Sequence, residues 1–332
     1  MLSGSRRALA EVTLLFITLL WGVSFPLIRF LVGTPHEHGT TPEGFLMGPV
    51  ALAAWRFAIA GTLVLVLAVL DRAHRLNELA AGAAPHHTES LALSPRFGWH
   101  VWVLSLLLVV SFAAQAIGMT DTTAANSALI TGLNVVFVPF LAPLVGRLRP
   151  PMIIYIAAMV AFAGIAMLTD VRKLEMPRSG DLWTLFCAVT FALHLIYVAV
   201  YTPHHRVLML AAGQLVVSAV LFFMLAAARG ESLMLPWPAL LPVLVLAIGC
   251  TAFPLVGSTW AQRHLTESHA ALIYSLEPVA GAALGILILG EYFGPEFLLG
   301  GTLVIAGILM ARPRDEEPGQ PPIHLNREAG LS

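Results

Sequence analysis

The chain has 332 residues, of which 58% are apolar and 11% are charged, with a mean hydropathy of +0.83 and a formal net charge of −1. A soluble domain needs a hydrated surface, with roughly a quarter of its residues charged. The composition therefore excludes a soluble globular protein. The apolar runs are long and lack the alternation of membrane-barrel strands, so we expect an all-α integral membrane protein. No basic cluster points to nucleic acid as a partner.

Ten apolar segments follow one another, and each is about long enough for a spanning helix. They fall at about 9–32, 49–70, 100–119, 123–146, 151–169, 182–201, 207–228, 239–261, 268–289 and 296–311. The first run is too long for a signal peptide, so we expect a retained helix. Residues 71–98 are predicted to form a poorly ordered loop, and residues 313–332 a disordered cytoplasmic tail, because they are rich in polar residues or proline.

Basic residues are distributed unequally between the two sides that ten spans define. With the N-terminus inside, the inner side holds Arg6, Arg7, Arg72, Arg75, Arg96, Arg147, Arg149, Arg206, Arg263, Arg312, Arg314 and Arg327. The outer side holds Arg172, Lys173, Arg178 and Arg229. The side richer in basic residues normally faces the cytoplasm. We therefore expect both termini to be cytoplasmic, in a multi-pass protein of the cell membrane.

The two halves of the sequence are similar when they are shifted by 143 residues. Residues 128–169 then match residues 271–312 at 11 of 42 positions, without a gap. Each half holds five predicted helices, and an odd number of spans gives the halves opposite orientations in the membrane. Such inverted repeats are typical of secondary transporters, which bind their substrate near the midplane between the repeats.

Short motifs accompany this repeat. They are Leu20-Trp21-Gly22, Trp55-Arg56-Phe57, Ala271-Leu272-Ile273, Leu276-Glu277-Pro278 and Leu289-Gly290-Glu291, followed by Gly300 and Gly307. In this order they resemble the drug/metabolite transporter superfamily, in its ten-helix EamA-type branch. The resemblance implies two inverted five-helix repeats, over residues 1–170 and 181–312. It also implies transport, usually export, of metabolites such as amino acids.

Two ionisable residues are predicted to lie inside the membrane, where such groups are costly and commonly functional. Glu277 lies near the middle of its segment, so it is a candidate for carrying a proton or binding a cationic group; the alternative is that it pairs with a neighbouring helix. Arg56 is a candidate for binding a substrate carboxylate, or for neutralising Glu277 or another acid. Its alternative is to extend towards the outer interface. Pro278 is expected to interrupt the helix beside Glu277, and Pro26, Pro139, Pro143 and Pro254 to interrupt other helices.

Polar and aromatic residues supply the remaining candidates for a metabolite site. Asn134 corresponds to Glu277 under the 143-residue shift, and Thr131 corresponds to Tyr274. The substrate-binding or coupling candidates besides Glu277 and Arg56 are Asn134, His194, Tyr197, Tyr274, Trp21, Gln115 and Gln214. For each of them, packing or hydrogen bonding between helices remains an alternative.

The sequence therefore predicts an alternating-access secondary transporter of small metabolites, not an enzyme. Its expected partners are the lipid bilayer and a small-molecule metabolite, and protons and a second copy of the chain are further candidates. No cofactor and no metal site are expected, and Cys187 and Cys250 are interpreted as packing residues. The alternatives are a membrane-embedded enzyme of the lipid or acyl transferase type and a channel or sensor.

Overall fold

The computed structural model describes residues 2–32, 47–80, 94–118, 130–168, 179–280, 283 and 295–311. These ranges contain helices and turns but no strand. The first part comprises α1 (Leu2–Val32), α2 (Pro49–Ala80), α3 (Phe97–Gly118), α5 (Asn134–Leu141), the 3-10 turn η1 (Ala142–Val145) and α6 (Met152–Leu168). The second comprises α7 (Ser179–Tyr201), η3 (Thr202–His204), α8 (Val207–Ala228), η4 (Trp237–Ala239), α9 (Leu240–Ala247), the π-turn η5 (Ile248–Ala252), α10 (Phe253–Ala261), α11 (Glu267–Tyr274) and α13 (Pro295–Ala311).

Six helical stretches in these ranges are long and apolar enough to cross a membrane. They are Ser5–Ser24, Pro49–Glu78, Phe97–Gly118, Ser179–His204, Val207–Ala228 and Trp237–Ala261. Three apolar helices are shorter, namely Ile130–Val145, Met152–Met167 and Leu298–Ala311. Large apolar side chains such as Leu144 and Leu182 are exposed on the bundle, as lipid contact requires. The all-helical, multi-pass membrane character predicted from the sequence is confirmed.

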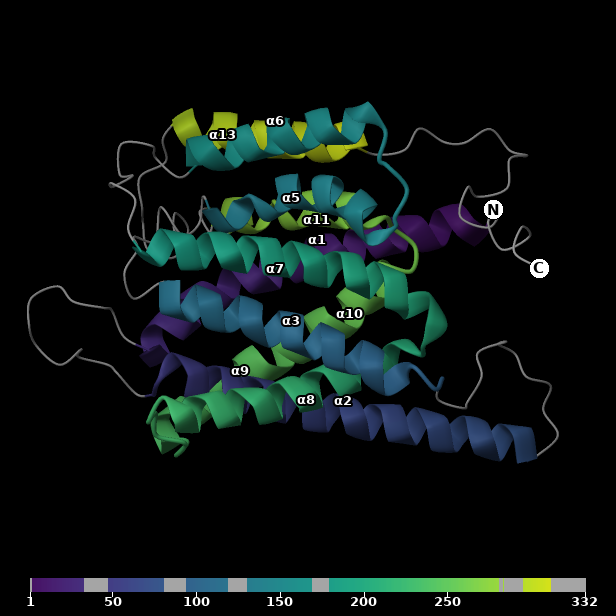
Figure 1. Ribbon diagram of the computed structural model, residues 1–332, viewed down its shortest axis with the longest axis vertical. Coiled ribbons are helices and arrows are strands. Elements are labelled where there is room, and N and C mark those ends of the chain that lie inside the picture. The colour runs from purple at the N-terminus through teal and green to yellow at the C-terminus, as the bar shows by residue number, and fades with distance from the viewer. Residues whose placement is uncertain are drawn as a thin grey trace, which may run out of the picture.

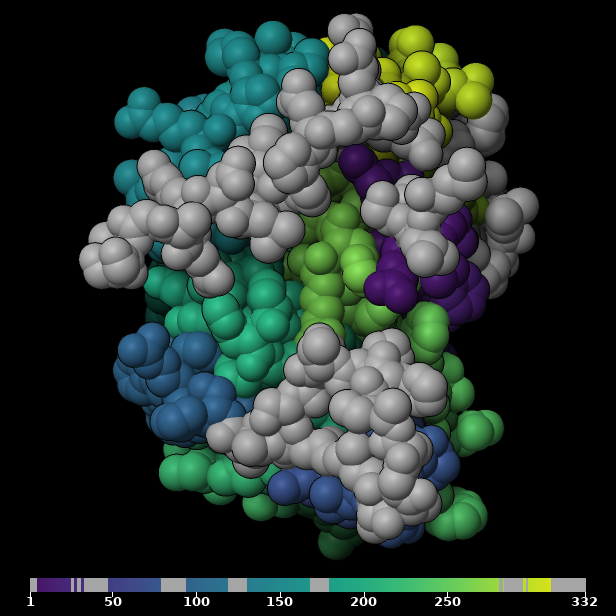
Figure 2. Space-filling view, turned by 90° about the vertical axis from the view of Figure 1, so that its right-hand side faces the viewer, coloured from purple at the N-terminus to yellow at the C-terminus, as the bar shows by residue number. Residues whose placement is uncertain are grey.

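The helices pack in pairs that join distant parts of the chain. Helix α6 packs against α13 at one edge of the bundle, and α2 packs against α8 at the opposite edge (Figure 1). Between these edges, α5 contacts α11, α1 contacts α10, and α3 contacts α7. Figure 2 views the bundle from the end where α1 begins, and shows α1 in purple beside the green segment that contains α10. The largest apolar cluster lies between α2, α8 and α9, with Phe57 against Phe222.

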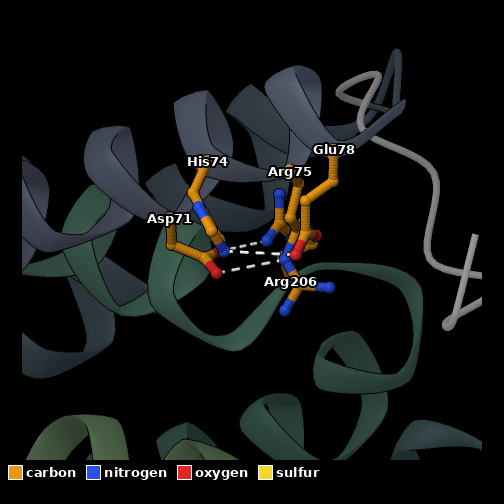
Figure 3. A network of polar contacts seen from close by, with 5 residues as sticks. All are labelled: Asp71, His74, Arg75, Glu78 and Arg206. Carbon is orange, nitrogen blue, oxygen red and sulfur yellow. Dashed lines mark hydrogen bonds and ion pairs between the residues drawn. The ribbon is translucent and has the colours of Figure 1, made fainter. Parts of the chain in front are cut away.

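Helix α2 extends ten residues beyond the apolar segment that predicted it. Residues 71–80 are helical, so the prediction of a poorly ordered loop over 71–98 is wrong for this part. Ion pairs four residues apart stabilise a polar helix, and α2 has two: Asp71 with Arg75 at 3.0 Å and His74 with Glu78 at 3.2 Å. Asp71 also pairs with Arg206 at the start of α8 (Figure 3). Residues 81–93 and the expected tail at 313–332 lie outside the described residues.

Helices α6 and α13 approach closely through two glycines. A Cβ atom on Gly164 would lie 2.5 Å from the Gly300 carbonyl oxygen and 2.8 Å from the Val304 nitrogen. A Cβ atom on Gly307 would lie 2.7 Å from the Ala157 carbonyl oxygen. The 143-residue shift relates Gly164 to Gly307 and Ala157 to Gly300. The contact of Gly164 with Gly300 therefore corresponds to the contact of Gly307 with Ala157. Small residues permit this close approach of two membrane helices.

Two helices are interrupted at positions that the same shift relates. Residues 130–132 are helical, Leu133 forms a turn, and α5 begins at Asn134. In the second half α11 ends at Tyr274, Ser275 and Leu276 form a turn, and residues 277–280 are helical again. Pro278 cannot donate to the Tyr274 carbonyl and its ring crowds that group, which accounts for the second interruption as predicted. No proline explains the first.

The glycine contacts between α6 and α13 predict a stability effect. Gly164→Ala is expected to lower the free energy of unfolding by roughly 1–3 kcal/mol, because the new methyl group overlaps backbone atoms of α13. Gly307→Ala should behave alike. The control is Gly98→Ala, since nothing lies within 4 Å of a Cβ atom there. Denaturation of the purified variants in one detergent measures the effect, and equal stability of Gly164→Ala and Gly98→Ala would contradict it.

Candidate functional site

Arg56 lies on α2 inside a membrane-spanning stretch and is only 6% exposed. Its Nε and Nη2 groups both donate to the Thr251 hydroxyl of η5, at 3.3 and 3.1 Å. The Thr251 hydroxyl in turn donates to the Leu246 carbonyl at 2.8 Å. Among the residues that the structure describes, no acidic side chain forms an ion pair with Arg56. The side chain therefore points into the bundle and binds a neutral hydroxyl.

The π-turn that carries Thr251 has a cause in the sequence. Pro254 has no N–H to donate to the carbonyl of Cys250, and its ring crowds that carbonyl. The helix widens into the π-turn Ile248–Ala252 just before this proline, a device common at functional sites. The turn also contacts α1, because the Cys250 thiol donates to the Leu20 carbonyl at 3.3 Å. It thereby joins the Trp55-Arg56-Phe57 motif to the Leu20-Trp21-Gly22 motif.

Trp21 and Tyr274 form the next part of the interior. Their ring centroids are 5.1 Å apart, so the structure brings these two predicted site residues together. Tyr274 is 3% exposed, and its hydroxyl lies beside Gln262 and Ser258. Neither the Tyr274 hydroxyl nor the Gln262 Oε1 atom makes a hydrogen bond of normal geometry within the described chain. Buried polar atoms without a partner are rare in proteins, so this group has capacity to bind a ligand or water.

Asn134 and Glu277 occupy the first helical positions after the two helix interruptions. Asn134 is buried at the start of α5, and Glu277 is half-buried. Glu277 lies close enough to Cys187 of α7 for an electrostatic interaction. No hydrogen bond or ion pair to the Glu277 carboxylate occurs between residues that the structure describes. The prediction that Arg56 neutralises Glu277 finds no support, because Arg56 binds Thr251 instead.

His194 and Gln214 belong to a second polar group, between α3, α7 and α8. His194 Nε2 lies 3.0 Å from Gln214 Oε1, and the Ser105 hydroxyl donates to the Gln214 carbonyl oxygen at 3.3 Å. The His194 Nδ1 atom and the Ser218 hydroxyl are buried and have no hydrogen-bond partner in the described ranges. Two predicted residues are thus in direct contact, in a group separate from Arg56.

Tyr197 and Gln115 do not join either group. Tyr197 packs against Tyr201, with ring centroids 5.4 Å apart, in a small cluster with Phe97. Gln115 is half-buried on α3 and makes no side-chain hydrogen bond within the described residues. Sequence reasoning also missed Thr251 and Gln262. A signal was available for Thr251, because it lies three residues before Pro254 on an apolar helix.

Ion pairs hold the bundle together at the end where α1 begins. Arg147 donates from Nε and Nη2 to the two carboxylate oxygens of Glu267 at 3.1 and 3.0 Å. This pair ties the segment after η1 to the start of α11. Glu11 of α1 lies 3.4 Å from Arg7 and 3.6 Å from His269 of α11. These contacts link α1, α11 and the end of the first half.

A histidine pair lies at the same end of the bundle. Burial, together with repulsion by His100, His204 and Arg263, lowers the pKa of His205 to about 4. The His205 ring is therefore uncharged near pH 7, and it shares a hydrogen bond with His100 at 2.7 Å. Within the described chain no group of three or more metal-ligating side chains occurs. The arrangement suits packing at the start of α8 more than metal binding.

The opposite end is tied by a carboxylate at the start of α2. Glu231 Oε2 accepts hydrogen bonds from the backbone N–H groups of Val50 and Ala51 at 3.0 and 2.8 Å. Glu231 Oε1 accepts from Arg229 at 3.3 Å. A cavity of about 350 Å³ opens here, lined by Met47, Gly48, Gly230, Glu231, Ser232, Met234 and Pro236. Both ends of the α2–α8 pair are therefore fixed by polar contacts.

The Arg147–Glu267 pair predicts coupled effects on stability. Arg147→Gln is expected to lower the free energy of unfolding by roughly 1–3 kcal/mol, because Glu267 then keeps a nearly buried charge without its partner. Combined with Glu267→Gln, the total loss should be smaller than the sum of the two single losses, since one interaction is lost only once. Denaturation in detergent measures these values, with the exposed Arg149→Gln as control. Additive losses would contradict the pairing.

The chain is similar in sequence to a family of transporters and to several individual transporters. Residues 178–312 match the EamA-like transporter family. An uncharacterized transporter of Archaeoglobus fulgidus is 23% identical over 94% of this chain and 88% of its own length. One of Methanothermobacter thermautotrophicus is 22% identical over 92% and 86%. The uncharacterized transporter YyaM of Bacillus subtilis is 22% identical over 90% and 92%.

A solved structure, titled only as a crystal structure of a protein, has a similar fold. It is 17% identical, with a TM-score of 0.68 over 92% of this chain and 98% of its own. This likeness supports the arrangement of the helices alone. The family match and the named relatives confirm the resemblance that the motifs predicted. The second half of this chain, residues 178–312, matches the EamA-like transporter family.

Proposed function

We propose that this protein is a secondary transporter that moves a small polar metabolite across the cell membrane by alternating access. The observation that carries the proposal is that Arg56 and Glu277 lie inside a bundle of membrane helices, without an ion-pair partner among the described residues. An uncompensated charge in such a place is costly, and it is retained where it binds a substrate or an ion. The relatives' names agree with transport, and not with an enzyme.

The proposed architecture is ten spanning helices in two inverted five-helix halves, over residues 1–170 and 181–312. Its support is the exchange of contacts between the halves. The Gly164 and Gly307 contacts are related by the 143-residue shift, and so are the interruptions at Leu133 and Leu276. When each helix is replaced by the corresponding helix of the other half, the α3–α7 contact becomes the α1–α10 contact. The α2–α8, α5–α11 and α6–α13 contacts remain the same pairs under this replacement. A two-fold relation produces such self-complementary contacts.

The proposed orientation puts the Arg147–Glu267 end of the bundle in the cytoplasm, together with both termini. Arg147 and Arg206 are at this end, where α1 begins and α2 ends (Figure 1). Arg229 is at the other end, beside the start of α2. This division follows the positive-inside rule. In an alternating-access cycle the contacts at each end would separate in turn, since the cargo must reach the interior from both sides.

The cargo site is proposed at the centre, around Trp21, Tyr274, Asn134 and Glu277, with Arg56 as a second charged determinant. Both helix interruptions occur here, and broken helices supply free backbone groups that line transporter sites. His194 and Gln214 line the adjoining side of the interior. Glu277 is assigned the coupling role, in which it binds either a proton or a cationic group of the cargo. Amino acids or related compounds, exported from the cell, are the cargo that the family resemblance favours.

Counterflow in proteoliposomes tests this function. Labelled amino acids and related metabolites are offered to vesicles that are preloaded with the same unlabelled compound. Saturable accumulation of some solute is expected for the wild-type protein, because a carrier exchanges cargo whereas a pore only equilibrates it. Folded protein that exchanges nothing across a broad panel would overturn the proposal.

Glu277→Gln tests the coupling role in the same vesicles. The amide cannot ionise, so the response of uptake to a pH gradient is expected to fall by about tenfold or more if Glu277 carries the proton. Glu296→Gln, at the exposed start of α13, is the matched control. A wild-type response in Glu277→Gln would exclude the proton-carrying role. If exchange itself is lost as well, Glu277 contacts the cargo.

A further inference from the structure

Two arginines are buried in the described part of the chain, and they differ in their partners. Arg206 lies at the edge of the bundle and pairs with Asp71. Arg56 lies within a spanning helix and is bound only by the hydroxyl of Thr251. A guanidinium group keeps its positive charge in proteins. Arg56 therefore carries a charge that no described acidic residue balances.

The hydrogen bonds of Arg56 leave one edge of the guanidinium group unoccupied. Nε and Nη2 both donate to the single Thr251 oxygen. No acceptor is bound to Nη1 among the residues that the structure describes. The Nη1–Nη2 edge presents two parallel N–H groups, a geometry that matches two oxygens of a carboxylate or phosphate. Thr251 fixes the orientation of this edge by binding the adjacent Nε–Nη2 edge.

The surroundings of Arg56 offer no alternative compensation. The apolar cluster between α2, α8 and α9 includes Phe57, which follows Arg56, and Ala252, which follows Thr251. The thiol of Cys250 has an electrostatic effect on Arg56, but this thiol already donates to the Leu20 carbonyl. Since an unpaired charge in an apolar interior is strongly unfavourable, a mobile anion that enters the bundle would bind here. The hydrogen bond from Cys250 to Leu20 connects this point to the proposed cargo site, because Trp21 directly follows Leu20.

We propose that Arg56 and Thr251 form a subsite for an oxyanion group of the cargo, either a carboxylate or a phosphate. The guanidinium edge binds two oxygens of this group, and the Thr251 hydroxyl positions the guanidinium without touching the cargo. Thr251 is thus a positioning residue, created by the π-turn that precedes Pro254. This inference rests on the proposed transport function, and deepens it by naming the chemical class of the cargo.

The test compares acids with neutral analogues of the same shape. L-leucine and L-leucinamide, L-glutamate and L-glutamine, succinate and succinamide, and inorganic phosphate serve as probes. Stabilisation of the detergent-purified protein against heat reports binding without transport, and counterflow reports transport. We expect stabilisation by an acid or by phosphate and not by the corresponding amide. Which probe stabilises the protein distinguishes a carboxylate from a phosphate.

Four variants locate the effect. Arg56→Gln is expected to weaken binding of the stabilising probe by about tenfold or more, and Arg56→Lys by less, because lysine keeps the charge but not the paired donors. Thr251→Val keeps the shape and removes the hydroxyl, so it should raise the apparent Kd and KM several-fold. Thr251→Ser, which retains the hydroxyl, should stay within about twofold of wild type. If Arg56→Gln fails to fold, the Thr251 pair still decides the matter.

The outcomes separate this inference from the function on which it rests. Exchange of amides as readily as acids, or an Arg56→Gln variant with wild-type affinity for acids, would overturn the oxyanion subsite and leave transport intact. Equal loss in Thr251→Val and Thr251→Ser would overturn the positioning role. Stabilisation by an oxyanion without any counterflow would retain the subsite and overturn transport. If no oxyanion stabilises the protein and no oxyanion is exchanged, the proposed subsite does not exist.

Discussion

The hydrocarbon interior of a membrane offers no water to polar groups, so each polar group inside it must find a partner within the protein. This constraint explains the helices themselves and the hydroxyl groups at their irregular points. Thr18 donates to the Leu14 carbonyl, Thr251 to the Leu246 carbonyl and Ser275 to the Leu272 carbonyl, at 2.7, 2.8 and 2.5 Å. Thr18 lies within the regular part of α1, whereas Thr251 and Ser275 satisfy backbone oxygens close to the openings before Pro254 and Pro278. Arg56 is the prominent exception among the described residues, because a single hydroxyl cannot balance its charge.

The helix pairs that join the two halves differ in how firmly they are held together. The α6–α13 pair is held by glycines with backbone against backbone, and the α2–α8 pair by Asp71 with Arg206 at one end and Glu231 at the other. The α6–α13 and α2–α8 pairs are therefore suited to keep their packing during a change of conformation. The α5–α11 pair is interrupted in both helices and carries Asn134 and Glu277 at the interruptions. A change of shape is accommodated most easily where the backbone is already broken.

The sequence predicted the fold well where hydrophobicity decides it. Each of the ten predicted apolar segments contains a helix in the part that the structure describes, because long apolar runs have few alternatives in a membrane. The interruption beside Glu277 was predictable from Pro278. The extension of α2 to Ala80 was missed, since it depends on ion pairs and on Arg206, which is distant in sequence. The interruption at Leu133 was not predicted, because no proline causes it.

The candidate site was predictable in its residue types, but not in its pairings. The prohibitive cost of buried charge pointed to Arg56 and Glu277, whereas the partner of Arg56 depends on a π-turn on another helix. His194 and Gln214 were both named, yet their contact across α7 and α8 follows from tertiary packing. Tyr197 shared the helical spacing of His194 but faces another cluster, so spacing on one helix was insufficient.

Alternating access around Glu277 is the central claim, and a native cysteine reports on it. Cys187 lies close enough to Glu277 for an electrostatic interaction, and the chain has a single other cysteine, Cys250. In a Cys250→Ser background, the rate at which a membrane-impermeant thiol reagent modifies Cys187 can be measured from each face of oriented vesicles. The account predicts that a transported cargo raises the rate from one face and lowers it from the other. Modification from neither face, or rates that cargo leaves unchanged on both, would contradict it.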